Sequence, residues 1–61
     1  MNQIKAAEKA DITQGYLSLI ITGKRRPDWD LAKILAEITK TDVALWMEGD
    51  EQKKRQALNA A

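Results

Sequence analysis

Residues 3–23, with the sequence QIKAAEKADITQGYLSLIITG, decide the fold of this chain. The first of them are strong helix formers, and small apolar side chains recur among them at helical spacing. Thr13 is placed to cap a second helix over residues 14–22, because its side-chain oxygen can accept a hydrogen bond from a free backbone N–H. Gly23 follows where a helix-ending glycine adopts the left-handed conformation at little cost. The stretch therefore predicts two short helices joined by a turn at Asp11.

The packing of these two helices also follows from the stretch. A pair of helices that cross steeply needs a small residue at the crossing, and Ala7 supplies it. The apolar side chains expected at the contact are Ala6 and Ala10 from the first helix, with Ile12, Leu17 and Ile20 from the segment after the turn. Asp11 suits the turn itself, because aspartate tolerates left-handed backbone better than most residues.

The rest of the chain continues the helical pattern. Pro27 disfavours helix at the residue before it, so residues 24–27 form a basic loop. Further helices are expected over residues 29–39, 43–48 and 51–59, with Asp28, then Thr41 or Asp42, and then Asp50 as N-caps. The core-facing stripe predicted for the helix 29–39 consists of Leu31, Ile34, Leu35 and Ile38. With no strand, repeat or low-complexity segment, the predicted fold class is all-α, a small bundle of four to five short helices.

Composition excludes several classes of protein. The chain has 61 residues, enough for one domain, and no cysteine or histidine, which rules out disulfides, thiolate metal sites and imidazole chemistry. The carboxylates are scattered in a helix-cap and surface pattern, and Gly23 with Lys24 lacks the context of a phosphate-binding loop. We therefore expect no catalytic residue, no metal site, no cofactor and no enzyme activity. Chains this small usually need reinforcement beyond one core, and a homodimer would provide it.

The cellular location is predicted from the lack of a membrane span and of a signal peptide in this sequence. No apolar run reaches the roughly 18–20 residues of a membrane span. The first five residues, MNQIK, lead into no apolar signal-peptide stretch. We expect a cytoplasmic protein that has no membrane partner.

Charge is distributed unevenly although the net charge is only +1. Residues 1–27 carry five basic and two acidic side chains, whereas residues 28–50 carry two basic and six acidic ones. Residues 51–61 are basic again, with three basic side chains against one acidic. Such asymmetry predicts a molecule that presents one face to an anionic partner.

From Gln3 to about Met47, the sequence resembles the phage repressor and Cro-type helix-turn-helix family. The matching features are Gln3, Ala7, Ile12-Thr13-Gln14, Tyr16-Leu17-Ser18, Ile20, the loop Gly23-Lys24-Arg25-Arg26-Pro27, and Asp42-Val43-Ala44-Leu45-Trp46. The resemblance implies a lambda-repressor-like fold whose second motif helix enters the major groove of double-stranded DNA. The chain departs from the family in having Asp11 where the family usually has glycine. It also lacks the helix that usually precedes Gln3, so it is either a trimmed variant or a chain whose exposed side is covered by a partner.

The resemblance and the chemistry of the groove assign roles to the exposed residues. Gln14 is the main base-contacting candidate, because a glutamine amide can bond adenine N6 and N7 together. The other base-contacting candidates are Gly15, Ser18 and Leu19. The phosphate-binding candidates are Asn2, Gln3, Tyr16, Thr22, Lys24, Arg25 and Arg26. The family resemblance further implies that Gln3 bonds a phosphate and braces Gln14.

Several alternatives stay open. Leu19 can contact a thymine methyl group or pack against protein, and Tyr16 can reach a phosphate or only pack. We expect both tryptophans, Trp29 and Trp46, in the core or half-buried, with stacking on bases as the alternative. We expect residues 53–55 (KKR) on a solvated face, with a second DNA contact as the alternative.

For the whole chain we predict a helix-turn-helix DNA-binding domain over residues 1–49 and a basic C-terminal helix or tail over residues 50–61. The predicted partner is a palindromic operator bound by a homodimer, with no small-molecule effector, since no residues remain for a sensing domain. The alternative function is a protein–protein interaction module of antitoxin or adaptor type. Such a module would bind its partner through the acidic middle of the chain.

Overall fold

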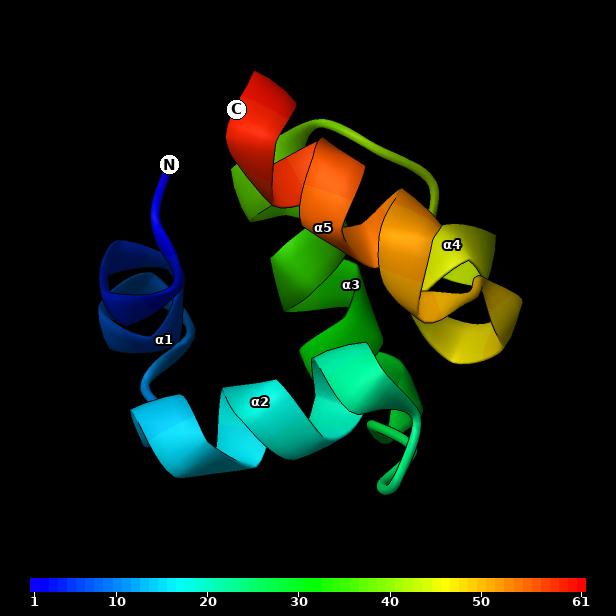
Figure 1. Cartoon of the computed structure of the whole chain (residues 1–61), viewed down its shortest axis with the longest axis horizontal. Coiled ribbons are helices and arrows are strands. Elements are labelled where there is room, and N and C mark those ends of the chain that lie inside the picture. Colours follow the sequence, from blue (N-terminus) through cyan, green and yellow to red (C-terminus); the bar gives the residue numbers. More distant parts are fainter.

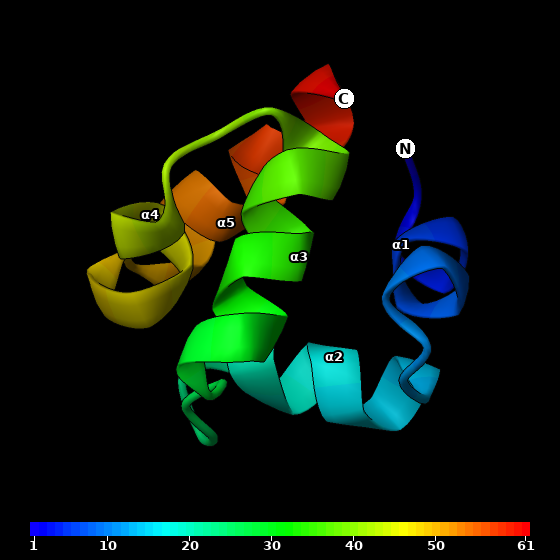
Figure 2. The same cartoon turned by 180° about the vertical axis from the view of Figure 1, so that it is seen from behind.

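The computed structural model describes all 61 residues as an all-α bundle without strands. Its helices are α1 (Gln3–Ala10), α2 (Gln14–Thr22), α3 (Trp29–Thr39), α4 (Val43–Glu48) and α5 (Glu51–Ala60) (Figure 1). In the view from behind, α3 stands between α1 and α4 while α2 crosses below it (Figure 2). No helix is long and apolar enough to cross a membrane. The predicted fold class is confirmed.

Side-chain caps account for where four of the helices begin, and Thr13, Asp28 and Asp50 are the caps predicted from sequence. The side chains of Asn2, Thr13, Asp28 and Asp50 each accept a hydrogen bond from the backbone N–H three residues further on. Asp42 precedes α4 but makes no such bond. These bonds satisfy N–H groups that a helix leaves without an internal partner.

Left-handed residues end three of the helices. Gly23 has φ 83° after α2, and Asp11 has φ 59° after α1, so aspartate does take the turn position as expected. Lys40 ends α3 with φ 56°, which the sequence did not indicate. Gly49, after α4, does not have left-handed backbone. Glycine is needed there for space, because a Cβ atom would collide with the Leu45 carbonyl oxygen.

The core forms where α1, α2 and α3 meet, with α4 and α5 closing it. The predicted contact between α1 and α2 is confirmed, since Ala6, Ala7, Ala10, Leu17 and Ile20 are all buried. Ile12 is half-buried and packs against this cluster.

Two predictions on α3 are wrong. Ile34 remains 39% exposed and Trp29 59% exposed, although both were expected to pack inward. The buried stripe of α3 instead consists of Leu31, Ala32, Leu35, Ala36 and Thr39. This stripe is rotated toward the small residues because α1 and α4 pack on both sides of it, and that places Ile34 at its edge.

Trp46 takes the core position expected for it. The side chain is fully buried, and its indole Nε1 lies 3.3 Å from Thr39 Oγ1 and 3.2 Å from Thr41 Oγ1, to which it donates. A buried indole N–H needs such a partner. The aromatic ring therefore fixes α4 against α3 and offers no surface to another chain.

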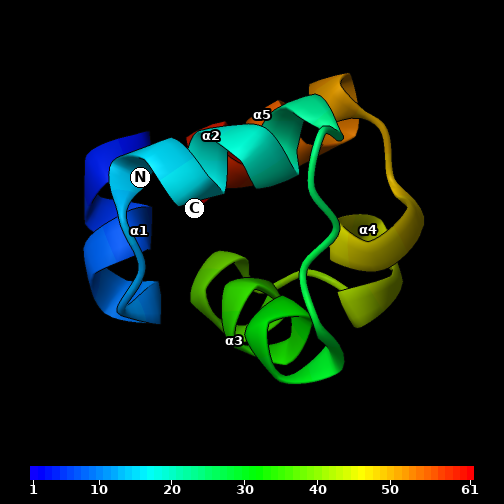
Figure 3. The ribbon, with the colours of Figure 1, turned by 90° about the horizontal axis from the view of Figure 1, so that it is seen from below.

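Helix α5 covers the side of the molecule that would otherwise be open. It contacts α2, α3 and α4, and buries Ala57 and Leu58 (Figures 1 and 3). The amino group of Met1 donates to the carbonyl oxygens of Leu58 at 2.9 Å and Ala61 at 3.2 Å. The last turn of α5 thus lies against the first residue of the chain.

Candidate nucleic-acid interface

Helix α2 has one buried side and one exposed side. Leu17, Ile20 and Ile21 are completely buried and fix the helix on the core. The exposed or half-buried base-contacting candidates are Gln14 at the start of the helix and, further around it, Gly15, Ser18 and Leu19. Leu19 is 39% exposed, which removes simple core packing as its role. All four base-contacting candidates are therefore accessible on one helix.

The beginning of α1 lies beside the beginning of α2. The amide Nε2 of Gln3 donates to the backbone carbonyl oxygen of Gln14 at 3.4 Å, at the long limit for a hydrogen bond. The bond goes to the main chain of Gln14, so the Gln14 amide stays free to contact a base. The structure thus brings together the two glutamines that the resemblance paired.

A shallow groove runs along the outer side of α2. Its open volume is about 610 Å³, and it is lined by Thr13, Gly15, Tyr16, Leu19 and Arg25. A Cβ atom added at Gly15 would meet nothing within 4 Å, so the glycine leaves this surface open. The groove combines an apolar wall with one guanidinium at its edge.

Tyr16 contacts the basic loop. Arg25 Cζ lies 5.6 Å from the centre of the Tyr16 ring, within the range of a cation–π contact. The backbone N–H of Arg25 also donates to the Leu19 carbonyl oxygen at 3.1 Å. The loop is therefore held close to the exposed side of α2, with its cationic group available to an anion.

Besides Gln3, two of the phosphate-binding candidates have polar atoms already engaged. Asn2 Oδ1 accepts from the Lys5 N–H at 2.8 Å, which leaves only its amide NH₂ free. Thr22 Oγ1 donates within α2 to the carbonyl oxygens of Ser18 at 3.0 Å and Leu19 at 3.3 Å. A hydroxyl has one proton, so Thr22 would have to release those carbonyls to donate to a phosphate.

The basic loop diverges after Arg25. Lys24 and Arg26 are both exposed, but Arg26 lines a small hollow of about 180 Å³ with Glu48 and Lys54. Arg26 therefore points toward α4 and α5, away from the groove beside Tyr16. The three basic residues of the loop do not form one cluster.

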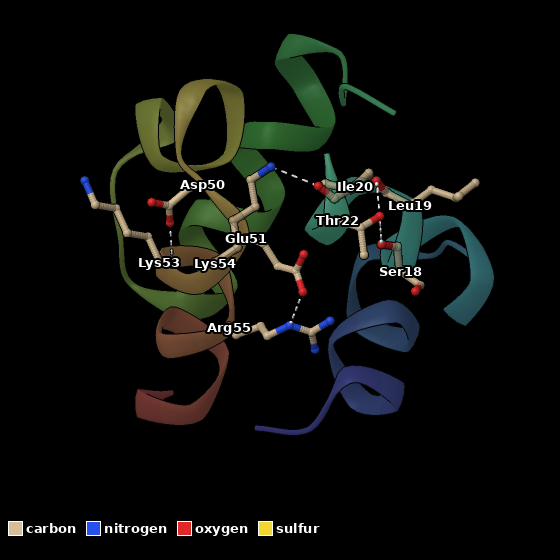
Figure 4. Close-up of polar contacts among 9 residues, drawn as sticks. All are labelled: Ser18, Leu19, Ile20, Thr22, Asp50, Glu51, Lys53, Lys54 and Arg55. Carbon is tan, nitrogen blue, oxygen red and sulfur yellow. Dashed lines mark hydrogen bonds and ion pairs between the residues drawn. The ribbon is translucent and has the colours of Figure 1, made fainter. Parts of the chain in front are cut away.

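Lys54 contradicts the prediction of a solvated basic face over residues 53–55. It is only 5% exposed, and its Nζ donates to the Ile20 carbonyl oxygen near the end of α2 at 2.9 Å (Figure 4). Burial lowers the pKa of Lys54, the charge of Arg26 lowers it further, and Asp50 opposes both. Its spacing of three and four from Ala57 and Leu58 marks it as part of the buried stripe of α5, a signal that its charge obscured.

Comparison with known proteins gives one match. A family model described as "Helix-turn-helix" matches residues 1–46, a range that contains α1, α2 and α3 and reaches into α4. No curated protein matches the chain, and no solved structure does.

Proposed function

This chain belongs to the helix-turn-helix family of phage repressor and Cro-like regulators, and we propose that it is a sequence-specific transcriptional regulator of phage or prophage type. The family binds double-stranded DNA. In the proposal, α2 enters the major groove and its first residues contact base edges. The observation that carries the proposal is that Gln14, Gly15, Ser18 and Leu19 are all accessible on α2, where Gly15 and Leu19 line an open groove.

Within this proposal, Gln14 contacts adenine, and Leu19 beside Gly15 contacts a thymine methyl group. The major groove displays an acceptor and a donor side by side on adenine and a methyl group on thymine. Ser18 lies on the same side of α2 and is able to donate to or accept from either kind of base edge. The main-chain contact of Gln3 supports the role of Gln14, because it holds the start of α2 while leaving the Gln14 amide free.

The proposed phosphate contacts surround this surface. Gln3 and the free amide of Asn2 lie at the start of α1, Tyr16 and Arg25 line the groove, and Lys24 is exposed in the loop next to Arg25. Thr22 and Arg26 are weaker members of the set, since one is bonded within its helix and the other lines a different hollow. Such contacts fix the orientation of the protein on DNA without selecting a sequence.

A second candidate function rests on α3. Trp29 and Ile34 are exposed there, on a helix that also carries Asp30 and Glu37. Exposed apolar side chains on a helix with acidic groups suit a protein partner, as in an antitoxin or adaptor. DNA binding remains the better-supported function because the matched family binds double-stranded DNA.

Selection of bound duplexes from a random pool tests the proposal. A DNA regulator should enrich one motif, and its affinity should fall steeply between two salt concentrations because counterions are released. An interaction module would enrich no motif and would bind random duplex weakly at both concentrations.

A further inference from the structure

Helix α5 carries three basic side chains that face in different directions. Lys54 is buried against α2, and Lys53 projects from the side of α5 that faces away from α2 (Figure 4). Arg55 extends from the side that faces α1 and α2, with its side chain 51% exposed (Figure 4). Arg55 lies beyond residues 1–46, so family membership assigns it no role.

The surroundings of Arg55 join it to the proposed interface. An open hollow of about 220 Å³ is lined by Met1, Asn2 and Gln3 from the start of the chain and by Arg55, Leu58 and Asn59 from α5. Gln3 in turn contacts the main chain of Gln14. The surface that begins at α2 thus continues across the start of α1 and reaches Arg55.

The Arg55 guanidinium still has donors to offer. Its Nε donates to Glu51 Oε2 at 2.9 Å, and that carboxylate is 48% exposed. A guanidinium carries five N–H donors in a planar fork, so the terminal nitrogens remain available while Nε is bonded. An exposed ion pair of this kind is weak in water and competes poorly with a phosphate that arrives with the rest of the interface.

We propose, resting on the proposed function, that Arg55 binds a backbone phosphate of the DNA strand that passes Asn2 and Gln3. Glu51 holds the guanidinium in place before DNA arrives and opposes binding through its negative charge. The ligand is a phosphodiester, so Arg55 raises the affinity for every sequence and leaves base preference unchanged. The helix that completes the fold thereby also extends the DNA-binding surface.

The decisive comparison is Arg55→Gln against Lys53→Gln. Both substitutions remove one positive charge from α5, on opposite sides of the helix. Arg55→Gln should weaken binding to selected and random duplexes by about three- to tenfold and flatten the slope of log K against log salt by about 0.9. Lys53→Gln should change neither quantity measurably. Arg55→Lys keeps the charge and should keep the salt slope.

Glu51→Gln separates phosphate binding from a structural role of the ion pair. It breaks the same ion pair as Arg55→Gln but leaves the guanidinium intact, so it should strengthen binding. Thermal melts of each variant establish that the fold is retained. A loss with Glu51→Gln as large as with Arg55→Gln would overturn the proposal, and so would equal losses for Arg55→Gln and Lys53→Gln.

The variant Arg25→Gln distinguishes two outcomes: that Arg55 takes no part in DNA binding, and that the protein does not bind DNA at all. If Arg25→Gln weakens binding while Arg55→Gln has no effect, the protein binds DNA but Arg55 takes no part. If the unsubstituted chain shows no salt-dependent binding to any duplex, the proposed function fails, and the role of Arg55 fails with it.

Discussion

At the scale of single residues, α2 separates groups that would select a sequence from groups that would only hold the DNA. Gln14 begins the helix directly after its cap, with its side-chain amide unbonded in the structure. Arg25 lies over the Tyr16 ring at the groove, where its guanidinium can reach an anion. The two residues should therefore respond differently to substitution.

Replacing Gln14 with alanine should cost about 1–3 kcal/mol on the selected site and relax the preference at one base pair in each half-site. Binding to random duplex should hardly change, because phosphates dominate that affinity. Gln3→Ala should also weaken binding to the selected site. The double variant should lose less than the sum, because Gln3 acts through the start of α2. Titrations of both duplexes measure these effects, and equal losses on both would make Gln14 structural.

Replacing Arg25 with alanine should weaken binding to all sequences alike and flatten the salt slope by about one unit. The reason is that a phosphate contact contributes affinity through counterion release and carries no base information. Binding to the selected and a scrambled duplex at several salt concentrations measures this. A change in the selected motif would instead assign Arg25 to a base edge.

At the scale of the helices, stability depends on how each one ends and on how α5 is attached. Asp11 and Lys40 both take left-handed backbone that glycine adopts without strain. Lys54 places a cationic group beside the C-terminal end of α2, where the helix dipole favours positive charge. That favourable position is offset by the desolvation of the buried ammonium.

Lys40→Gly should stabilise the fold by up to about 1 kcal/mol. Left-handed backbone costs a non-glycine residue roughly 1–2 kcal/mol, and the greater freedom of glycine in the unfolded chain takes back part of that gain. Urea unfolding of the two proteins measures the difference. Lys33→Gly, in the middle of α3, is the control and should destabilise by about 1 kcal/mol. Destabilisation by Lys40→Gly would contradict the left-handed assignment.

Because the pKa of Lys54 is lowered, the free energy of unfolding should change with pH in the alkaline range. Desolvation by burial is the main cause, and the charge of Arg26 adds to it. The unfolded chain holds this proton more tightly than the folded chain, so stability is lowest where Lys54 is charged in both states. It should rise with pH between the folded-state pKa and the ordinary value of 10.5.

Lys54→Met provides the reference for that prediction, because methionine fills similar space and does not titrate. As the pH rises toward 10.5, the free energy of unfolding of the native chain should increase relative to that of Lys54→Met. Urea unfolding at a series of pH values measures it. Parallel curves for the two proteins would show that burial leaves the pKa of Lys54 unchanged.

At the scale of the whole molecule, one chain presents only a short DNA-contacting surface. The nine-residue helix α2 carries all four base-contacting candidates, and such a helix covers few base pairs. Two copies on a two-fold symmetric site would double that surface. Trp46 is buried and therefore has no surface for contact between the two copies, whereas Trp29 and Ile34 are exposed and accessible to a second copy.

We expect the protein to bind DNA as a homodimer, with half-sites centred about 10 bp apart, one helical turn. The selected motif should be palindromic, and sedimentation on that duplex should give two chains for each site. Duplexes with five base pairs inserted between the half-sites serve as the control and should bind more weakly, because the second half-site then faces the opposite side of the DNA. One chain for each site with an asymmetric footprint would exclude the dimer.

The sequence by itself determined the all-α class, the bounds of α2, α3 and α4, and the contact of Ala7 with the second helix. These features depend on local signals, since caps, helix-ending residues and apolar spacing act over a few residues. Gln14 as the leading base contact also came from sequence, through its place after Thr13. That role stays a prediction until DNA binding is measured.

Only the tertiary structure decided the features that depend on distant partners. The exposure of Trp29 and Ile34 depends on how α1 and α4 rotate the buried stripe of α3. The burial of Lys54 requires the end of α2, 34 residues away in sequence. The position of Arg55 beside Gln3 requires α5 to return to the start of the chain. Helical spacing fixes which residues share a face, but only packing between helices far apart in sequence decides what that face meets.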